Sequence, residues 1–224
     1  MKHQIFFNQL SEIINRKSIL NHPFYKCWQA GKLEKKELEE YMKQYYHLEN
    51  TFPRFMSAIH ANCENADMRK IMLKDLVGEE GEATNHVAQL LTFSEALGLS
   101  KDEVVKSKAN QNTSEAIAAF LQLTQDKNIN KGLSTLATYK EQIRRVAATK
   151  EQGLKDYYGI ESVQALQFFT THAKVNTAWH ELLDEMISEK EYPVALGAVN
   201  SICDAWWHYL DGVTTDAIKE RMVC

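Results

Sequence analysis

Three stretches of the sequence place ionisable or polar side chains on the face of a predicted helix that should be apolar. In the first stretch, steps of three or four residues produce a single helical stripe. Its members are Met68, Met72, Asp75, Glu79, Glu82, His86, Leu90, Phe93 and Leu97. Burying an unpaired polar group costs roughly 1–3 kcal/mol, and a charged group more, so such side chains normally meet partners, a metal or a ligand.

The other two stretches repeat this mixture of apolar and polar side chains at helical spacing. The second stripe consists of Leu133, Leu136, Lys140, Ile143, Ala147, Lys150 and Leu154. The third consists of Leu166, Phe169, His172, Asn176, Trp179, Leu183 and Met186. Carboxylates, amines and an imidazole on the buried side of three helices predict a polar site inside a helical bundle.

The residue types at these positions indicate the chemistry of the site. Glu79 and His86 are seven residues apart, which puts both on one face of a regular helix, and His172 and Asn176 share a face in the same way. The two histidines suit general acid and base catalysis, because an unperturbed imidazole titrates near pH ~6.5. Lys140 and Asn176 could donate hydrogen bonds to a developing oxyanion or to reduced O2.

The elements that must position these residues all read as helices. We expect helices at about 2–18, 34–61, 66–98, 113–124, 130–153, 161–189 and 191–211. Pro53 predicts a kink, Gly78 and Gly81 a weak point, and residues 100–112 a loop; the final residues look frayed. No alternating strand pattern occurs. The sequence therefore predicts one all-α domain over residues 1–224, a bundle of seven to eight helices.

Composition narrows the class of protein. The chain has 224 residues with a net charge of −4 at pH 7, which argues against a dedicated nucleic-acid binder. Its 4 cysteines form no CxxC pair, so we expect reduced, mostly buried thiols of a cytoplasmic protein. The N-terminus lacks the apolar run of a signal peptide, and no apolar stretch of about 18 residues could span a membrane.

The sequence resembles the heme-oxygenase-like superfamily, in particular the TenA/PqqC family and the proteins related to CADD, the Chlamydia protein associating with death domains. The matching segments are collinear and extend over about residues 3–210. They are His22-Pro23-Phe24-Tyr25-Lys26-Cys27-Trp28 with Gly31-Lys32-Leu33, Phe52-Pro53-Arg54-Phe55 through His60, Glu79-Glu80 with Asn85-His86, Ala96-Leu97-Gly98, Tyr139 with Gln142-Ile143, and Phe169-Thr170-Thr171-His172. The resemblance implies the heme-oxygenase-like fold and a homodimer.

The resemblance also implies where a metal centre would lie. The di-metal oxidases of this superfamily use Glu-x6-His on one helix, a Glu on the next, and His-x3-Asp/Glu-x2-His on a third. These positions fall on Glu79, His86, Lys140, His172, Asn176 and Trp179. Only Glu79, His86 and His172 keep the ligand type. Because a protonated ammonium repels a metal ion, we expect Lys140 to pair with Glu79 and the chain to hold no full di-metal centre.

Two further positions follow from the resemblance. The CADD-related proteins are thought to make p-aminobenzoate for folate from their own tyrosine, with a lysine as a candidate nitrogen donor. The corresponding residues are Tyr25 and Lys150. That chemistry is attributed to a metal-activated oxidant, which the lost ligand positions would not supply. Taken alone, Tyr25 is a core aromatic and Lys150 a solvated or snorkelling side chain.

Three functions remain open from the sequence. The first is an O2-dependent oxidoreductase that acts on a small aromatic or heterocyclic molecule in folate- or PQQ-type cofactor metabolism, without a bound cofactor. Its catalytic residues would be Glu79, His86, Lys140, His172, Asn176, Tyr25 and Lys150. The second is a metal-dependent oxidase with Fe or Mn on Glu79, His86 and His172. The third is a non-catalytic protein that binds a small ligand or another protein.

Overall fold

The computed structural model describes residues 2–81, 83–174 and 178–223, and these residues form helices and connecting turns without a strand. The prediction of an all-α fold is confirmed, but seven to eight helices is too few. The α-helices are α1 (Gln4–Arg16), α2 (Pro23–Gln29), α3 (Lys35–Asn62), α4 (Ala66–Leu76), α5 (His86–Ala96), α6 (Lys101–Val105), α7 (Gln111–Thr124), α8 (Ile129–Tyr158), α9 (Val163–His172), α10 (Ala178–Met186), α11 (Tyr192–Asp211) and α12 (Asp216–Val223).

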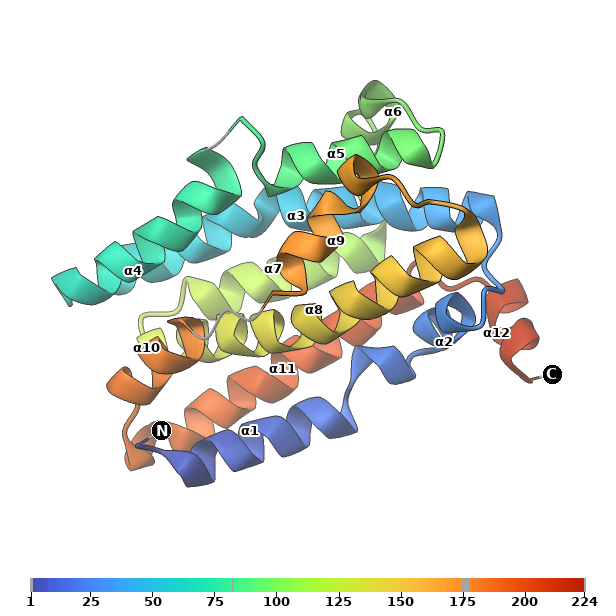
Figure 1. Ribbon diagram of the computed structural model, residues 1–224. Coiled ribbons are helices and arrows are strands. Elements are labelled where there is room, and N and C mark those ends of the chain that lie inside the picture. Colours follow the sequence, from blue (N-terminus) through green and yellow to red (C-terminus); the bar gives the residue numbers. More distant parts are fainter. Residues whose placement is uncertain (1, 82, 175–177, 224) are drawn as a thin grey trace.

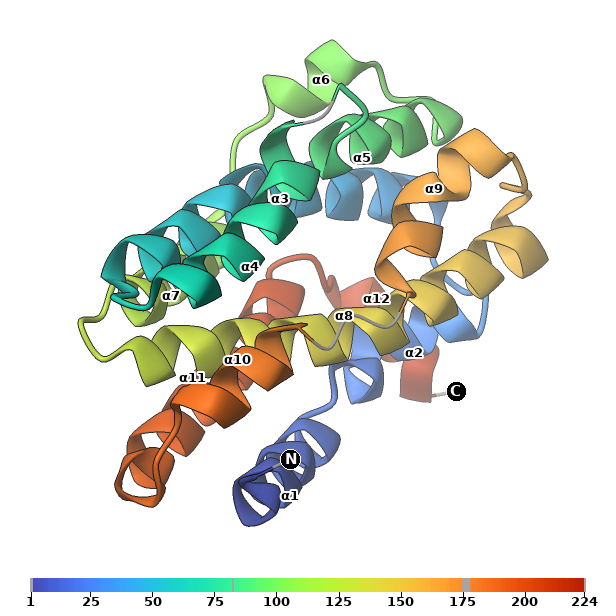
Figure 2. The same cartoon turned by 60° about the vertical axis from the view of Figure 1, so that its left-hand side comes forward.

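Helix α8 runs through the middle of the bundle (Figure 1). Helices α7 and α11 pack along α8 and along each other, and α1 lies beside α11. Helix α9 packs on both α5 and α8, which is visible in the turned view of Figure 2. Helices α3, α5, α8 and α9 therefore surround the interior that the three polar stripes face.

The local sequence explains the limits of α8. The side chain of Asn128 caps its first turn by accepting a hydrogen bond from the amide of Asn130. The helix ends at Gly159, whose φ of +65° is the left-handed conformation that glycine adopts most easily. Helix α8 is thus longer than the predicted range 130–153, and it carries the whole second stripe on one side.

The stretch 66–98 is not one helix, contrary to the prediction. Helix α4 ends at Leu76, a π-helical turn covers Val77–Gly81, and α5 begins only at His86, where the Asn85 side chain accepts from the amide of Ala88. A π-turn interrupts the regular helical register and is often found at functional sites. The weak point predicted at Gly78 and Gly81 is where the break occurs. Glu82 lies outside the described residues.

Other boundaries also differ from the prediction. The expected loop at 100–112 contains α6, because Ser100 and Glu103 form a capping box there. The expected helix 161–189 is divided into α9 and α10, and the expected frayed end contains α12. Helix α3 continues through Pro53 as one element.

Most of the buried apolar side chains belong to one cluster that reaches from Phe6 to Ile218. Cys27, Cys63 and Cys203 are buried free thiols, as predicted for the cysteines that the structure describes. Among the described residues, no helix combines the length and the apolar character needed to cross a membrane.

A close approach of α2 to α8 depends on Gly153. A Cβ atom at this position would lie 2.6 Å from Nε1 of the buried Trp28. We expect Gly153→Ala to lower the free energy of unfolding by about 1–3 kcal/mol, because the indole must move within a filled core. Denaturant unfolding measures the change. The control is Gly197→Ala in α11, where no atom lies within 4 Å of the new Cβ. That variant should be neutral or more stable by up to about 1 kcal/mol, and equal losses in both variants would contradict the packing argument.

Candidate active site

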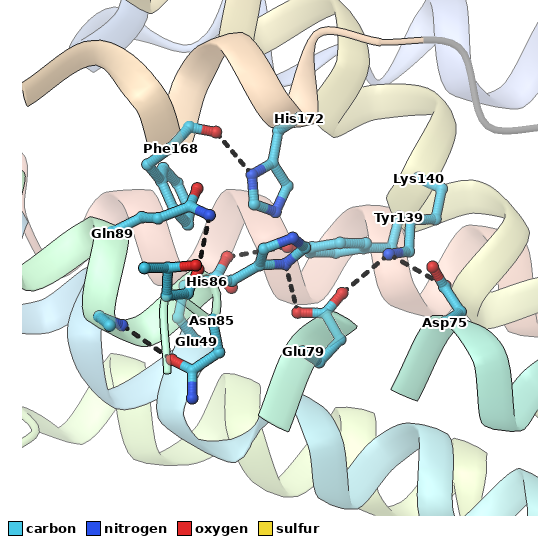
Figure 3. A network of polar contacts seen from close by, with 12 residues as sticks. Glu49, Asp75, Glu79, Asn85, His86, Gln89, Tyr139, Lys140, Phe168 and His172 are labelled. Atoms are coloured by element: carbon cyan, nitrogen blue, oxygen red, sulfur yellow. Dashed lines mark hydrogen bonds and ion pairs between the residues drawn. The ribbon is translucent and has the colours of Figure 1, made fainter. Parts of the chain in front are cut away.

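The carboxylate of Glu79 is the centre of a buried polar network (Figure 3). Its Oε2 accepts a hydrogen bond from His86 Nδ1 at 2.5 Å, and its Oε1 accepts one from Lys140 Nζ at 2.9 Å. The side chain of Glu79 is only 2% exposed, so both bonds lie away from bulk water. The ion pair between Glu79 and Lys140 that the sequence predicted is present.

Lys140 joins Glu79 to a second carboxylate. Its Nζ lies 3.3 Å from Oδ2 of Asp75, and the indole Nε1 of Trp179 donates a 2.6 Å hydrogen bond to the same oxygen. Trp179 is fully buried, and its N–H satisfies one oxygen of Asp75. The ammonium of Lys140 thus stands between two carboxylates, each of which has a further donor.

The charges in this network compensate one another. Burial opposes ionisation of Glu79, but Lys140 and His86 outweigh it and hold the pKa of the carboxyl well below its ordinary value. Burial likewise disfavours the charged form of Lys140, yet Glu79 and Asp75 raise the pKa of its amine above the usual range. For His86, burial is again outweighed by the bond to Glu79, which raises the imidazole pKa.

The imidazoles of His86 and His172 meet although they come from different helices. Their ring centroids are 4.4 Å apart, which confirms the predicted convergence of the first and third stripes. The Nδ1 of His172 donates to the backbone oxygen of Phe168 at 2.8 Å, while its Nε2 is buried and has no hydrogen-bond partner among the described residues. Burial and the neighbouring His86 lower the pKa of His172 to about 3. A neutral ring with a free acceptor nitrogen can accept a hydrogen bond from a bound molecule.

The prediction that Glu79 and His86 lie on one face of a regular helix is wrong, although their side chains are in contact. They do not share a helix face, since the π-turn and the start of α5 separate them. Their side chains are nevertheless in contact through the hydrogen bond between His86 Nδ1 and Glu79 Oε2. Asn176, which was predicted to complete the third stripe, lies outside the described residues.

Glu49 of α3 is a buried acid that the sequence analysis did not single out. Its side chain is 1% exposed, Tyr139 donates a 2.8 Å hydrogen bond to Oε1, and Oε2 has no partner in the described part of the chain. Burial and the nearby Glu79 raise its pKa. The sequence does indicate that Glu49 is buried, because it follows Tyr45 by four residues and precedes Phe52 by three. This spacing places it on the apolar stripe of α3.

Lys150 of α8 is enclosed by aromatic rings rather than by solvent. Its Nζ lies 4.1 Å from the ring centroid of Tyr45, 4.9 Å from that of Tyr41 and 5.7 Å from that of Tyr25. The residue is 1% exposed, so the interpretation as a solvated or snorkelling lysine is wrong. Burial lowers the pKa of the amine to about 7, and the distant Glu49 opposes this only in part. A large share of Lys150 is therefore a neutral amine near pH 7.

Tyr25 belongs to the same group of rings. Its hydroxyl is 3.0 Å from that of Tyr41, and both side chains are buried. Burial raises the pKa of each phenol well above the ordinary value. The structure thus brings together Tyr25 and Lys150, the two residues singled out by resemblance, although Tyr45 is the tyrosine ring closest to the amine. We call Lys150 with Tyr25, Tyr41 and Tyr45 the lysine–tyrosine cluster.

The donor atoms of the residues that the structure describes do not fit a di-metal centre. Both oxygens of Glu79 are engaged by cationic or donor groups, and the ammonium of Lys140 and the indole of Trp179 stand at two of the positions that the resemblance assigned to metal ligands. Over residues 2–81, 83–174 and 178–223, no group of three or more His, Cys, Asp or Glu side chains is placed to hold a metal ion. An ammonium supplies no lone pair to a metal while it is protonated.

Comparison with known proteins identifies the family of this chain. The chain matches the TENA/THI-4/PQQC family over residues 8–216. A protein of Chlamydia muridarum named 4-aminobenzoate synthase is 34% identical over 209 residues, which cover 92% of this chain and 89% of that protein. A pyrroloquinoline-quinone synthase of Acidiphilium cryptum is 22% identical over 86% of this chain and 81% of its own. The crystal structure of a CADD-like protein of unknown function from Nostoc punctiforme has the same fold, with a TM-score of 0.79, 15% identity, and coverage of 96% of this chain and 100% of that one.

Proposed function

Because the chain belongs to the TENA/THI-4/PQQC family, we propose that it is an oxidoreductase of cofactor metabolism that forms 4-aminobenzoate or a closely related aromatic amine. The single observation that carries this proposal is the position of Lys150. An amine with a pKa of about 7 lies inside a group of tyrosine rings, buried and in contact with their faces. A neutral amine is the nucleophilic form, so it is the form that can be transferred to a ring.

The proposed reaction uses Tyr25 as the source of the ring. Conversion of a tyrosine side chain to 4-aminobenzoate replaces the ring C–O bond with a C–N bond and breaks the Cα–Cβ bond, so that Cβ becomes the carboxylate carbon. The nitrogen comes from Lys150: its Nζ condenses with the oxidised ring carbon, and the phenolic oxygen leaves as water. The C=N bond then shifts to Cε and is hydrolysed, which breaks the Cε–Nζ bond, frees the aromatic amine and leaves Cε as an aldehyde. Cα takes up a hydrogen, so that residue 25 becomes a glycine. The change at Cβ is an oxidation, and O2 is the oxidant that we propose.

The polar network around Glu79 would manage protons and charge for this reaction. His172 has a neutral nitrogen that can accept a proton, and His86 is an imidazole whose protonated form is stabilised by its hydrogen bond to Glu79. The two adjacent rings can therefore accept and donate protons as O2 is reduced. The buried ammonium of Lys140 supplies a fixed positive charge close to these rings. Asn176 is proposed as a further donor on the grounds of sequence alone.

Removal of individual phenolic oxygens tests the assignment of Tyr25. Purified protein is incubated with O2 and a soluble one-electron reductant, and 4-aminobenzoate is measured by mass spectrometry. We expect Tyr25→Phe to lose the product, because the C–O bond that the reaction replaces is missing. The matched control is Tyr45→Phe, which alters the ring closest to Lys150 and should retain product. Undiminished product from Tyr25→Phe would exclude this residue as the precursor.

We also propose that the site works without a full di-metal centre, because Lys140 neutralises the carboxylates that metal ions would otherwise neutralise. The alternative of a single iron or manganese on Glu79, His86 and His172 is favoured by one observation, the unpaired Nε2 of His172. It is disfavoured by the engagement of both Glu79 oxygens. Metal analysis of protein purified without chelators separates these proposals, and a stoichiometric metal complement would contradict the first.

A single substitution should create the ligand set that the chain lacks. We expect Lys140→Glu to bind Fe(II) or Mn(II) more tightly than the wild type, because it removes a repelling ammonium and adds a carboxylate ligand next to Glu79. Calorimetric titration with the metal alone gives the affinities. The control Lys140→Met removes the ammonium without adding a ligand and should gain less. Equal binding by wild type and Lys140→Glu would contradict the role given to Lys140.

A further inference from the structure

We infer that Glu49 of α3 is a further residue of the proposed reaction: held by Tyr139, its carboxylate stabilises the positive charge that forms on the Lys150 nitrogen when the amine adds to the tyrosine ring. The inference rests on the proposed function for this reaction step, but the interaction between Glu49 and Lys150 can be measured without it. It is carried by the burial of Glu49, by its place on α3, and by the neutral surroundings of the amine.

The carboxyl group of Glu49 is held at one oxygen only. Tyr139 of α8 donates a 2.8 Å hydrogen bond to Oε1, as Figure 3 shows, whereas Oε2 has no partner among the described residues. The side chain is 1% exposed, so water does not surround the free oxygen. A buried carboxyl group with an unpaired oxygen destabilises a fold, and packing alone therefore does not account for an acid at this position.

Glu49 continues a column of side chains along α3. Tyr41, Tyr45 and Glu49 follow one another at intervals of four residues, which places them on one side of the helix. The Lys150 amine lies over the face of the Tyr45 ring, 4.1 Å from its centroid, and the Tyr45 hydroxyl favours the ionised form of Glu49. The carboxyl group thus lies toward the hydroxyl end of the ring that the amine covers, and it acts on the amine across that ring rather than by contact.

The other groups that face the Lys150 amine carry no charge. They are the rings of Tyr25, Tyr41, Tyr45 and Phe169. Burial raises the pKa of each of the three phenols, so all three are neutral near pH 7. Among the described residues, Glu49 is the charged group that opposes the effect of burial on the pKa of Lys150.

Glu49 itself is surrounded by groups that have other partners. The titratable side chains that act on it are Tyr45, Glu79, His86 and Tyr139. Glu79 and His86 are hydrogen-bonded to each other, and Glu79 is also paired with Lys140. The charge of Glu49 is therefore not neutralised by these neighbours, and it remains available to a cation in the lysine–tyrosine cluster.

The addition step creates such a cation. The lone pair of Nζ forms a bond to the oxidised ring carbon of Tyr25, and an electron pair of the ring C=O bond moves to the oxygen. The nitrogen becomes positive and the oxygen negative, and no proton moves in this step. The Tyr41 hydroxyl, 3.0 Å from the Tyr25 oxygen, can donate a hydrogen bond to that oxygen. A carboxylate already held near the nitrogen stabilises the other charge without reorganisation.

Titration of Lys150 tests the interaction without any product. The protein is made with ¹³C at lysine Cε, and nuclear magnetic resonance follows the Lys150 signal, which is assigned by its absence from Lys150→Met. We expect Glu49→Gln to lower the pKa of Lys150 by about 1 or more, because it removes the charge that favours the ammonium and keeps the shape of the side chain. An unchanged pKa would overturn the inference. The matched control is Glu151→Gln, which is adjacent to Lys150 in sequence but removes a carboxylate paired with Lys155, and it should leave the pKa of Lys150 as it is.

Product formation at alkaline pH tests the role in the reaction. At about pH 9, Lys150 is a neutral amine in the wild type and in Glu49→Gln, so a difference in amine protonation cannot explain a difference in rate. We expect Glu49→Gln to form 4-aminobenzoate about tenfold more slowly or worse, while Glu151→Gln matches the wild type. Equal rates in the wild type and Glu49→Gln would overturn the catalytic part of the inference.

A second variant covers the case in which Glu49→Gln does not fold. Tyr139→Phe keeps the ring and removes the hydroxyl that holds the Glu49 carboxylate, so it should lower the pKa of Lys150 and slow the reaction in the same two assays. Wild-type behaviour in both assays would overturn the inference. Because the titration needs no product, failure of the proposed reaction and failure of the interaction between Glu49 and Lys150 are separate outcomes.

Discussion

Lys150→Met is expected to stabilise the protein at neutral and acidic pH by an amount on the order of 5 kcal/mol and to abolish formation of the aromatic amine. The stabilisation follows from burial, which lowers the pKa of Lys150 from 10.5 to about 7. A fall of that size corresponds to a cost of about 5 kcal/mol in the free energy of unfolding. The folded state bears the full cost at any pH at which the amine is protonated in both the unfolded and the folded chain. Methionine fills a similar volume without an ionisable group.

The pH dependence has a definite sign. A lysine whose pKa is lower in the folded state destabilises the fold fully below pH 7, less between pH 7 and 10.5, and not at all above 10.5. The stability difference between Lys150→Met and wild type should therefore shrink as the pH rises from 7. Denaturant unfolding at several pH values measures it. Lys155→Met, an exposed change on the same helix, should stay within about 0.5 kcal/mol of the wild type. A pH-independent difference for Lys150→Met would contradict the buried amine.

Lys140→Met should have the opposite effect and cost about 3–5 kcal/mol, because it leaves the buried Glu79 and the partly exposed Asp75 without their shared cation. Glu79 is 2% exposed and cannot recover its hydration without rearrangement of the bundle. Lys131→Met is a matched control on the same helix. Its ion pair with Asp126 is about one-third exposed on each side, so its loss should cost at most about 1 kcal/mol.

A second substitution in the same network separates loss of the ion pair from loss of packing. Glu79→Gln removes the charge that Lys140→Met leaves unpaired, so the double variant should be more stable than the sum of the two single losses predicts. Denaturant unfolding of the four proteins gives the coupling energy. Additive losses within about 0.5 kcal/mol would mean that Glu79 and Lys140 do not interact as described.

The sequence was informative about the site because polar residues interrupted otherwise apolar helical stripes. Asp75, Glu79, Lys140 and Trp179 lie on three separate stretches, and the structure joins them by direct contacts. The cost of burying such groups without partners made a shared interior site the simplest interpretation. The resemblance added Tyr25 and Lys150, which lie on different helices and which no spacing along the chain connects.

What the sequence could not give was the geometry where helices break. The arithmetic for Glu79 and His86 assumed a regular helix, whereas a π-turn depends on tertiary contacts that periodicity does not encode. Lys150 was misjudged for a related reason, since a lysine on an apolar stripe usually extends toward water. Whether its amine can do so depends on the tyrosines of α2 and α3 that close over it. Glu49 was overlooked although its spacing on α3 would have revealed it.

The most direct test of the central claim, that the buried amine of Lys150 becomes the nitrogen of the product, is an isotope measurement. The protein is produced with ¹⁵N only in lysine side chains, incubated with O2 and reductant, and its 4-aminobenzoate is analysed by mass spectrometry. We predict a product that carries ¹⁵N, together with loss of the Lys150 nitrogen from the corresponding peptide. Unlabelled product, or labelled product from Lys150→Met, would contradict the account.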